Sequence, residues 1–202
     1  MKKIVVMASG NGTNFQAIID SIDNGEIYGA QITQLICNNK RANAIERAKA
    51  NNIKSVLVDK NDKDYNSIIM ALLSAEEPDL IVLDGYMKIL PDYIIDRFPF
   101  KIINLHPSLL PAFGGKGFYG KKVHEAVINS GARFSGCTVH FATVKVDNGP
   151  IIEQRIVAVE DNDTPESLEE KVHEQEHIAL IFSINLVLSG KYSIYGNRTV
   201  RE

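Results

Sequence analysis

The chain has 202 residues, of which 45% are hydrophobic, and a formal net charge of -3 at pH 7. This length and composition suit one domain with a sizeable core. The weak negative charge, without any block of basic residues, argues against a nucleic-acid-binding protein. Small molecules are therefore the expected partners.

No apolar stretch approaches the roughly 20 residues of a membrane helix, and the apolar run at residues 4–8 is too short for the core of a signal peptide. We therefore expect a cytoplasmic protein without a membrane partner. The two cysteines, Cys37 and Cys137, lie far apart without ligand-like spacing, which predicts buried reduced thiols instead of a disulfide framework or a cysteine zinc site.

The first half of the chain alternates short β-branched runs with helical patterns. The expected strands are residues 4–6, 32–36, 55–58, 80–83 and 102–105, and the expected helices between them are residues 14–22, 41–51, 64–75 and 91–97. This alternation is typical of βαβ units. It predicts an α/β domain with a mostly parallel, twisted sheet and helices on both faces.

The pattern changes after residue 130. Two neighbouring strand-like runs, residues 135–142 and 150–159, predict an antiparallel addition to the sheet near the C-terminal end. A long helix follows, with Thr164 as its capping residue, Pro165 at its first position and an end near Gly190. Because no linker interrupts the chain, we expect one domain over residues 1–202.

Three of the expected strand ends carry polar residues and glycine. Open parallel sheets bind ligands beyond the carboxyl ends of their strands, so these segments are candidate sites. The first, residues 9–14, reads Ser-Gly-Asn-Gly-Thr-Asn and opens a helix, whose free amide groups and dipole favour a phosphate. It lacks the Walker ending and the third glycine of a dinucleotide fingerprint, and an ordinary strand-to-helix turn also fits. The second segment is residues 84–90.

The third strand end carries Asn104 and His106. Side chains two apart on a strand project to the same side, so a carboxamide and an imidazole stand together. Such a pair can stabilise a developing oxyanion and move a proton. Alternatively, Asn104 caps the turn that follows.

Asp147 belongs to an Asp-Asn-Gly-Pro segment whose composition alone predicts a turn. The strand before it carries His140 on the side opposite Cys137 and Val139. The turn could bring the carboxylate to His106, where it would orient the ring and favour its protonated form.

The long helix carries an acid on its apolar stripe, since Glu176 follows Leu168 and Val172 at spacings of four residues. A buried acid needs a partner, so Glu176 is either a ligand contact or part of a buried salt bridge.

The same helix contains an HExxH pattern, in which His173 and His177 would bind zinc while Glu174 acts as the base of a hydrolase. Such a site needs a third protein ligand, which would have to lie upstream, because neither His nor Asp follows His177 and the only acid is the terminal Glu202. We therefore expect no metal site.

Six segments together resemble the phosphoribosylglycinamide formyltransferase (glycinamide ribonucleotide transformylase) family of the folate-dependent formyltransferase superfamily. They are residues 9–14, 85–90, 104–111, 138–141, 147–150 and 175–177. The Asn-x-His-Pro-Ser-Leu-Leu-Pro segment is shared across the superfamily, whereas the first loop and the chain length select this family. The resemblance implies a Rossmann-like formyltransferase fold, with a phosphate-binding half over about residues 1–100 and a folate-binding and catalytic half over about 101–195.

The resemblance also implies a reaction. The formyl group of 10-formyltetrahydrofolate passes to the amine of N1-(5-phospho-D-ribosyl)glycinamide, giving N-formylglycinamide ribonucleotide and tetrahydrofolate in de novo purine biosynthesis. The implied catalytic residues are Asn104, His106 and Asp147, supported by Thr138 and His140. The implied substrate-binding residues are Gly12, Thr13, Asn14, Pro107 and Glu176. The implied residues for the formyl donor are Met87, Lys88, Ile89 and Leu90, together with Asn104 and Asp147.

The chain departs from the family pattern in two places. Residues 114–120 are rich in glycine, which suggests a mobile flap near the site, with His124 close by. His173 stands where some family members carry a longer cationic or amide side chain near the substrate, a difference that bears on substrate affinity and not on the reaction type. A formyltransferase with another acceptor, a formyltetrahydrofolate hydrolase and a zinc hydrolase remain the alternatives, and a homodimer remains open.

Overall fold

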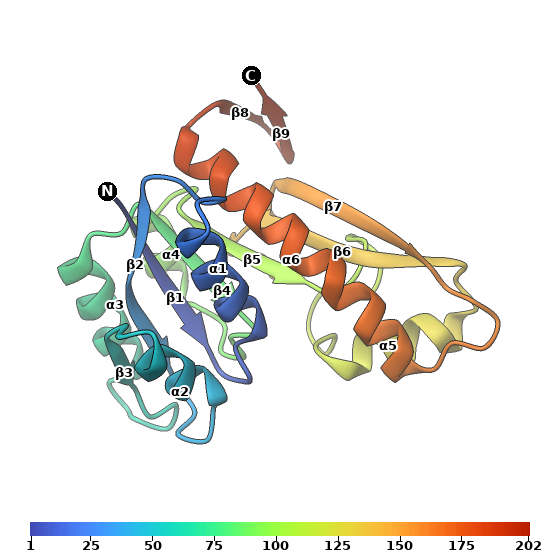
Figure 1. Ribbon diagram of the computed structural model, residues 1–202, viewed down its shortest axis with the longest axis horizontal. Coiled ribbons are helices and arrows are strands. Elements are labelled where there is room, and N and C mark those ends of the chain that lie inside the picture. Colours follow the sequence, from blue (N-terminus) through green and yellow to red (C-terminus); the bar gives the residue numbers. More distant parts are fainter.

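Nine strands form one sheet in the order β3-β2-β1-β4-β5-β6-β7-β9-β8 in the computed structural model, which describes residues 1–202 (Figure 1). The strands are β1 Lys2–Ala8, β2 Ala30–Cys37, β3 Ser55–Leu57, β4 Leu80–Asp84, β5 Ile102–His106, β6 Phe134–Phe141, β7 Ile151–Ala158, β8 Tyr192–Tyr195 and β9 Arg198–Arg201. The first five are mutually parallel, β6 is antiparallel to β5, and β7 is antiparallel to β6. The sheet is therefore mostly parallel with an antiparallel addition, as predicted.

Helices cover both faces of this sheet. They are α1 Thr13–Asp23, α2 Asn43–Ala50, α3 Tyr65–Glu76, α4 Asp92–Arg97, α5 Lys121–Ser130 and α6 Pro165–Ser189. One hydrophobic cluster joins one face of the sheet to α1, α2, α5 and α6, and a second joins the other face to α3 and α4. Helices α1 and α6 lie side by side over the first face (Figure 1).

Strand β1, the middle one of the five parallel strands, shows why this part of the sheet is buried on both sides. Every residue from Ile4 to Ala8 is fully buried. Ile4 and Val6 belong to the cluster of α1 and α6, whereas Val5 and Met7 belong to the cluster of α3 and α4. Alternate side chains thus enter opposite layers, which explains the continuous apolar run of a parallel strand.

The sequence did not predict three elements. Helix α5 has Gly120 as its N-cap and no side-chain cap, so it lacks a start signal. Strands β8 and β9 have four residues each and extend the sheet beyond β7. Runs this short carry little periodicity. No helix combines the length and apolarity needed to cross a membrane.

The strand order places a crevice at the carboxyl edge of the sheet. The chain moves outward from β1 to β2 and β3, then returns to place β4 on the other side of β1. Ligands of open α/β sheets bind at this reversal, between the ends of β1 and β4.

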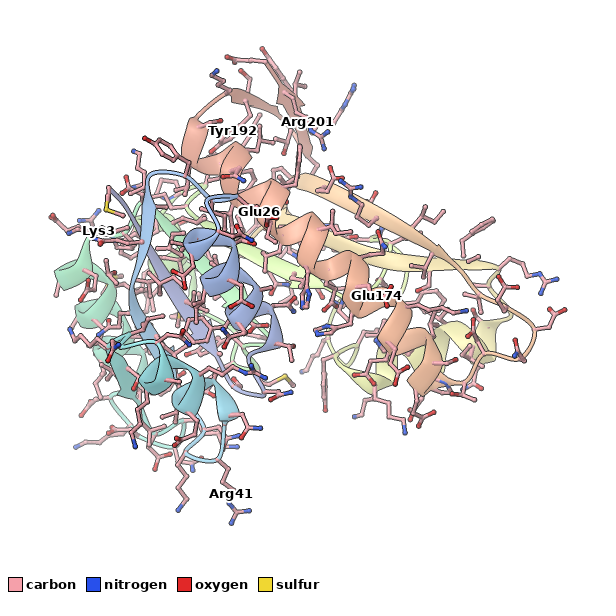
Figure 2. The ribbon with its side chains drawn as sticks, in the orientation of Figure 1. Lys3, Glu26, Arg41, Glu174, Tyr192 and Arg201 are labelled. Atoms are coloured by element: carbon pink, nitrogen blue, oxygen red, sulfur yellow. The ribbon has the colours of Figure 1, made fainter.

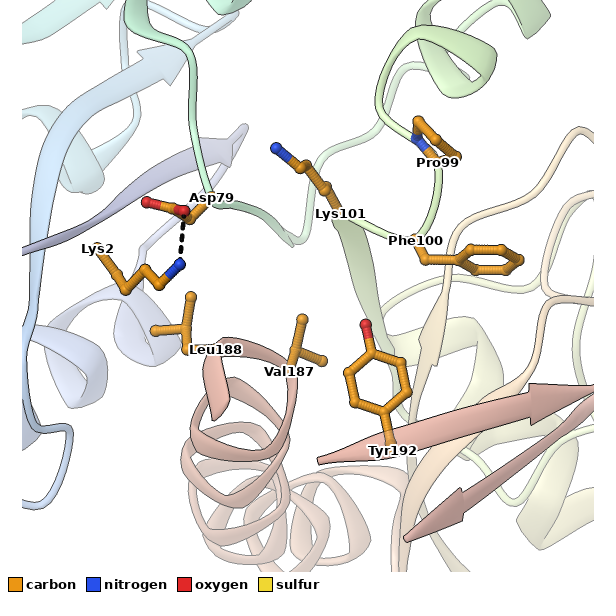
Figure 3. A pocket seen from close by; sticks show the side chains of 8 residues that line it. All are labelled: Lys2, Asp79, Pro99, Phe100, Lys101, Val187, Leu188 and Tyr192. Carbon is orange, nitrogen blue, oxygen red and sulfur yellow. Dashed lines mark hydrogen bonds and ion pairs between the residues drawn. The ribbon is translucent and has the colours of Figure 1, made fainter. Parts of the chain in front are cut away.

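A cavity of about 250 Å³ lies at the other end of the strands, opposite this carboxyl edge (Figure 3). Its lining is Lys2, Asp79, Pro99, Phe100, Lys101, Val187, Leu188 and Tyr192. Lys2 begins β1, and Lys101 immediately precedes β5. This cavity therefore lies at the amino ends of the strands, away from the polar segments expected to bind ligands.

Candidate active site

The pairing of β5 with β6 places four polar side chains on one face of the sheet. Asn104 lies opposite His140, and His106 lies opposite Thr138. Ile103 and Leu105, which flank Asn104, pack in the cluster that contains α6. Asn104 and His106 therefore project on the other face, as expected for residues two apart on a strand.

A turn after β6 returns to this face and delivers Asp147, whose φ of +52° lies in the left-handed region. Its Oδ2 lies 3.6 Å from Nδ1 of His106, and its Oδ1 lies 3.5 Å from Nδ2 of Asn104. The same Oδ1 is 3.6 Å from Nε2 of His140. The structure thus brings together the carboxamide, the imidazole and the distant carboxylate that the sequence singled out.

The Asp147 carboxyl group is held in its charged form. Its side chain is 9% exposed, and this burial alone would raise its pKa. Contact with His140, the backbone N–H of Gly115 and the nearby His106 outweigh burial, so the pKa is lower than that of an ordinary aspartic acid. A buried carboxylate with these partners can orient an imidazole and stabilise its positive charge.

Both ring nitrogens of His106 face oxygen atoms. Nε2 lies 2.9 Å from the backbone oxygen of Phe113, and Nδ1 faces Asp147. Because both oxygens are acceptors, the ring is best satisfied when both nitrogens carry hydrogen. In this conformation neither N–H points to a free position, so donation to a substrate requires the Phe113 carbonyl to withdraw.

The glycine-rich segment that was expected to form a flap lies directly on these residues. Besides the Phe113 contact with His106, Gly115 N–H donates to Oδ2 of Asp147 at 2.9 Å. These contacts involve backbone atoms, so the residue types do not predict them. Together, Phe113 and Gly115 cover two of the three proposed catalytic side chains, His106 and Asp147.

The two residues expected to support the site act differently. His140 is buried, with Nδ1 2.9 Å from the Phe141 oxygen and Nε2 3.2 Å from Nδ2 of Asn104. A proton on Nδ1 leaves Nε2 to accept from Asn104.

Thr138 holds the turn after β5 instead of contacting the cluster. Its hydroxyl donates to the Ser108 oxygen at 2.6 Å and accepts from Leu110 N–H and from the Gln154 amide, each at 3.0 Å. Pro107 begins this turn and is half-buried.

The expected phosphate loop forms a turn around Gly12, the N-cap of α1, whose φ is +71°. A Cβ atom at Gly12 would lie 2.8 Å from Cβ of Ala44 in α2. The glycine is thus required both by its backbone conformation and by the approach of α2. Thr13 and Asn14 begin α1, where amide groups lack partners within the helix.

We expect Gly12→Ala to lower the free energy of unfolding by about 1–3 kcal/mol, because it adds both strain and overlap. Chemical denaturation would measure this change. Gly10→Ala is a matched control in the same loop, since a Cβ there meets no atom within 4 Å. Equal stability of the two variants would contradict this account.

Glu176 links α6 to the phosphate loop. It is 8% exposed, and its Oε2 lies 2.9 Å from Nδ1 of His173 and 3.2 Å from Nδ2 of Asn14. The hydrogen bond to Glu176 raises the pKa of His173. Glu176 thus forms the buried salt bridge of the second interpretation, and its contact with a ligand stays a prediction.

The residues of the segment expected to bind the formyl donor differ in their exposure. Met87 and Ile89 are exposed, whereas the Leu90 side chain is buried in the cluster of α3 and α4, so only its backbone can serve a ligand. Lys88 donates to the Lys60 oxygen at 2.7 Å. A cavity of about 370 Å³ lies beside this segment and is lined by Ser9, Asn38, Asn39, Lys60, Asn61, Met87 and Lys88.

The residues of the HExxH pattern are arranged around Glu176. Nδ1 of His173 bonds to it, and the rings of His173 and His177 meet edge to face, 4.6 Å apart. Glu174, the base of a zinc hydrolase, is exposed on α6 (Figure 2). No group of three or more His, Cys, Asp or Glu side chains is arranged to hold a metal ion. His124, on α5, is buried, and burial lowers its pKa.

The fold is an α/β sheet with a glycine-containing loop at the end of β1 and an Asn-His-Asp cluster at the end of β5. The family model described as "Formyl transferase" matches residues 2–184. The chain belongs to this formyl transferase family.

Its relatives narrow the assignment. The chain is 42% identical over 180 residues to the chloroplastic phosphoribosylglycinamide formyltransferase of Vigna unguiculata, covering 87% of this chain and 57% of that protein. It is 38% identical to phosphoribosylglycinamide formyltransferase of Bacillus subtilis, covering 88% and 90%. The chain thus spans little more than half of the plant relative and most of the bacterial one.

Solved structures with similar folds include members of the same family. Glycinamide ribonucleotide transformylase 1 from Symbiobacterium toebii superposes with a TM-score of 0.92 at 34% identity, covering 100% of this chain and 94% of that one. A formyltetrahydrofolate deformylase from Pseudomonas syringae shares the fold at a TM-score of 0.89 and 26% identity, but the match covers 99% of this chain and 65% of that one.

Proposed function

We propose that the chain transfers the formyl group of 10-formyltetrahydrofolate to the amine of glycinamide ribonucleotide, forming the N-formyl product and tetrahydrofolate. This proposal rests on one observation: Asp147 lies beside Asn104 and His106 at the end of β5. The named relatives and the high structural similarity to a transformylase support the choice of substrates.

The proposed chemistry follows from the three side chains. The uncharged amine attacks the formyl carbon and forms a tetrahedral intermediate whose oxygen carries the negative charge. The Asn104 amide and the protonated His106 ring donate hydrogen bonds to that oxygen, once Phe113 has released the ring. Asp147 keeps the ring charged and orients a water that carries the proton from the attacking nitrogen to the folate nitrogen as the carbon–nitrogen bond breaks.

Substrate binding is proposed along the carboxyl edge. The phosphate takes the free amide groups at the start of α1, with Gly12, Thr13 and Asn14, and Glu176 accepts hydrogen bonds from the ribose hydroxyls. The pterin ring of the donor lies near the 87–90 segment, where exposed Met87 and Ile89 offer apolar contact. A cytoplasmic location and the lack of nucleic-acid and membrane partners stay predictions.

The test is an acceptor-dependent assay. With metal chelated, purified protein should release tetrahydrofolate from 10-formyltetrahydrofolate in the presence of glycinamide ribonucleotide and not in its absence. The matched control acceptor is the same riboside without its phosphate, which should react poorly because the α1 contacts are lost. Turnover without acceptor would favour the hydrolase alternative, and loss of turnover with chelator would favour the zinc alternative.

A further inference from the structure

The first turn of α1 is capped from another strand. Its N-cap, Gly12, has no side chain, and the turn contains no acidic residue. The amide groups of residues 13–15 have no acceptor within the helix. Oδ2 of Asp84, the last residue of β4, accepts the N–H of Phe15 at 3.1 Å. One of the free N–H donors at this helix end is thus already used by a carboxyl group.

Asp84 is buried at 8% exposure, and this burial raises its pKa to about 6. From α1, the Phe15 N–H and the Asn14 side chain favour its charged form. From α6, Glu176 disfavours that charge, whereas His173 favours it. The neighbouring strand β1 contributes the uncharged Ala8 opposite Asp84.

Asn14 gives an independent sign that the cluster is incomplete. It is 6% exposed and its Nδ2 bonds to Glu176, but its Oδ1 is buried without a donor. A buried acceptor without a donor lowers stability. A hydroxyl of a ligand, or a proton on the neighbouring carboxyl group, would satisfy it.

We propose that Asp84 is a specificity-determining residue of the phosphate site: it shares the amino end of α1 with the phosphate and couples binding of that dianion to uptake of one proton. The inference rests on the proposed function, which places a phosphate at this helix end. In this proposal the Asp84 carboxylate is a second anionic group at the helix end, and its protonation allows the phosphate to bind beside it.

The coupling follows from charge. A carboxylate on Phe15 N–H and a phosphate on the amides before it compete for the same positive helix end and repel each other. A protonated Asp84 still accepts from Phe15 through its carbonyl oxygen, and its new O–H can donate to the phosphate or to Oδ1 of Asn14. No covalent bond other than the O–H bond forms, and the proton comes from solvent.

The pH dependence has a definite sign. Below pH 6 Asp84 already carries its proton, so the dianion binds without proton uptake. Above pH 6 the proton must be taken up, and affinity falls by at most about tenfold per pH unit. A residue that merely capped the helix would affect stability without changing this profile.

The experiment measures binding of sulfate, a dianion whose own charge does not change near neutral pH, by calorimetry without folate. For the wild type we expect affinity to fall by about tenfold or more between pH 6 and pH 8, with proton uptake detected as a dependence of the heat on the buffer. Asp84→Asn, which keeps an oxygen for Phe15, should bind sulfate with less than about threefold change and little proton uptake.

Two further variants isolate the effect. Asp23→Asn, at the exposed far end of α1, should behave like the wild type. His173→Gln removes the neighbouring histidine, and in this background the fall in affinity between pH 6 and pH 8 should persist and be abolished by Asp84→Asn. Thermal unfolding confirms that each variant is folded.

The proposal is overturned if Asp84→Asn and the wild type lose affinity in parallel, if wild-type affinity does not change with pH, or if sulfate does not bind at either pH. Turnover is measured separately, and Asp84→Asn should change KM for the ribonucleotide at pH 8 while kcat stays within about twofold. Failure of formyl transfer would leave the sulfate result intact, so the two proposals can fail independently.

Discussion

Asp147→Asn is expected to lower kcat by about 10²-fold or more while the fold stays intact. Asparagine has nearly the same shape, so the backbone contact with Gly115 can persist through its amide oxygen. The negative charge is lost, and with it the reason for His106 to carry two hydrogens. Steady-state kinetics with both substrates would test this, since KM for the ribonucleotide should change much less than kcat.

The control is Asp96→Asn, which makes the same chemical change at an exposed position of α4. It should retain wild-type kinetics and stability. If Asp147→Asn also turned over at a near-normal rate, Asp147 would leave the catalytic group, and its contact with His106 would have to be structural.

The alternation of strands and helices was predictable because each parallel strand is buried on both faces and reads as a short apolar run. The long helix was equally visible, since Thr164 and Pro165 mark its start and Thr164 accepts from Ser167 N–H as a cap should. Helix α5 was not predicted because its N-cap is a glycine, which has no capping side chain.

The site was partly predictable for a similar reason. Asn104 and His106 share a strand, so their common face follows from the two-residue period alone. Asp147 required the register of β5 with β6 and a left-handed backbone, neither of which a local pattern specifies. The contacts from Phe113 and Gly115 come from backbone atoms, and residue type does not predict such contacts.

Asp84 shows a different limit. It belongs to a strand-end segment that the sequence marked as polar, but a single carboxylate there fits either an exposed turn or a buried partner. Only the position of β4 beside β1, and of α1 above both, places its oxygen on Phe15 N–H. Its chemical environment was thus set by three elements that are distant in the chain.

Asn104→Ala is expected to lower kcat by about 10²–10³-fold, the usual effect of removing one oxyanion donor. In the absence of substrate, Nδ2 of Asn104 faces Nε2 of His140 at 3.2 Å and Oδ1 of Asp147 at 3.5 Å. The donor is therefore already oriented within the cluster, so little reorganisation is needed when a formyl oxygen takes its place.

Two comparisons separate donation to substrate from support of the neighbouring residues. Asn162→Ala removes an exposed asparagine from the turn before α6 and should leave the rate unchanged. His140→Ala removes the present partner of Asn104 and should slow turnover much less than Asn104→Ala, because His140 holds the amide without meeting the reacting carbon. Equal losses in the Asn104 and His140 variants would mean that Asn104 acts through His140, and the oxyanion would then need another donor.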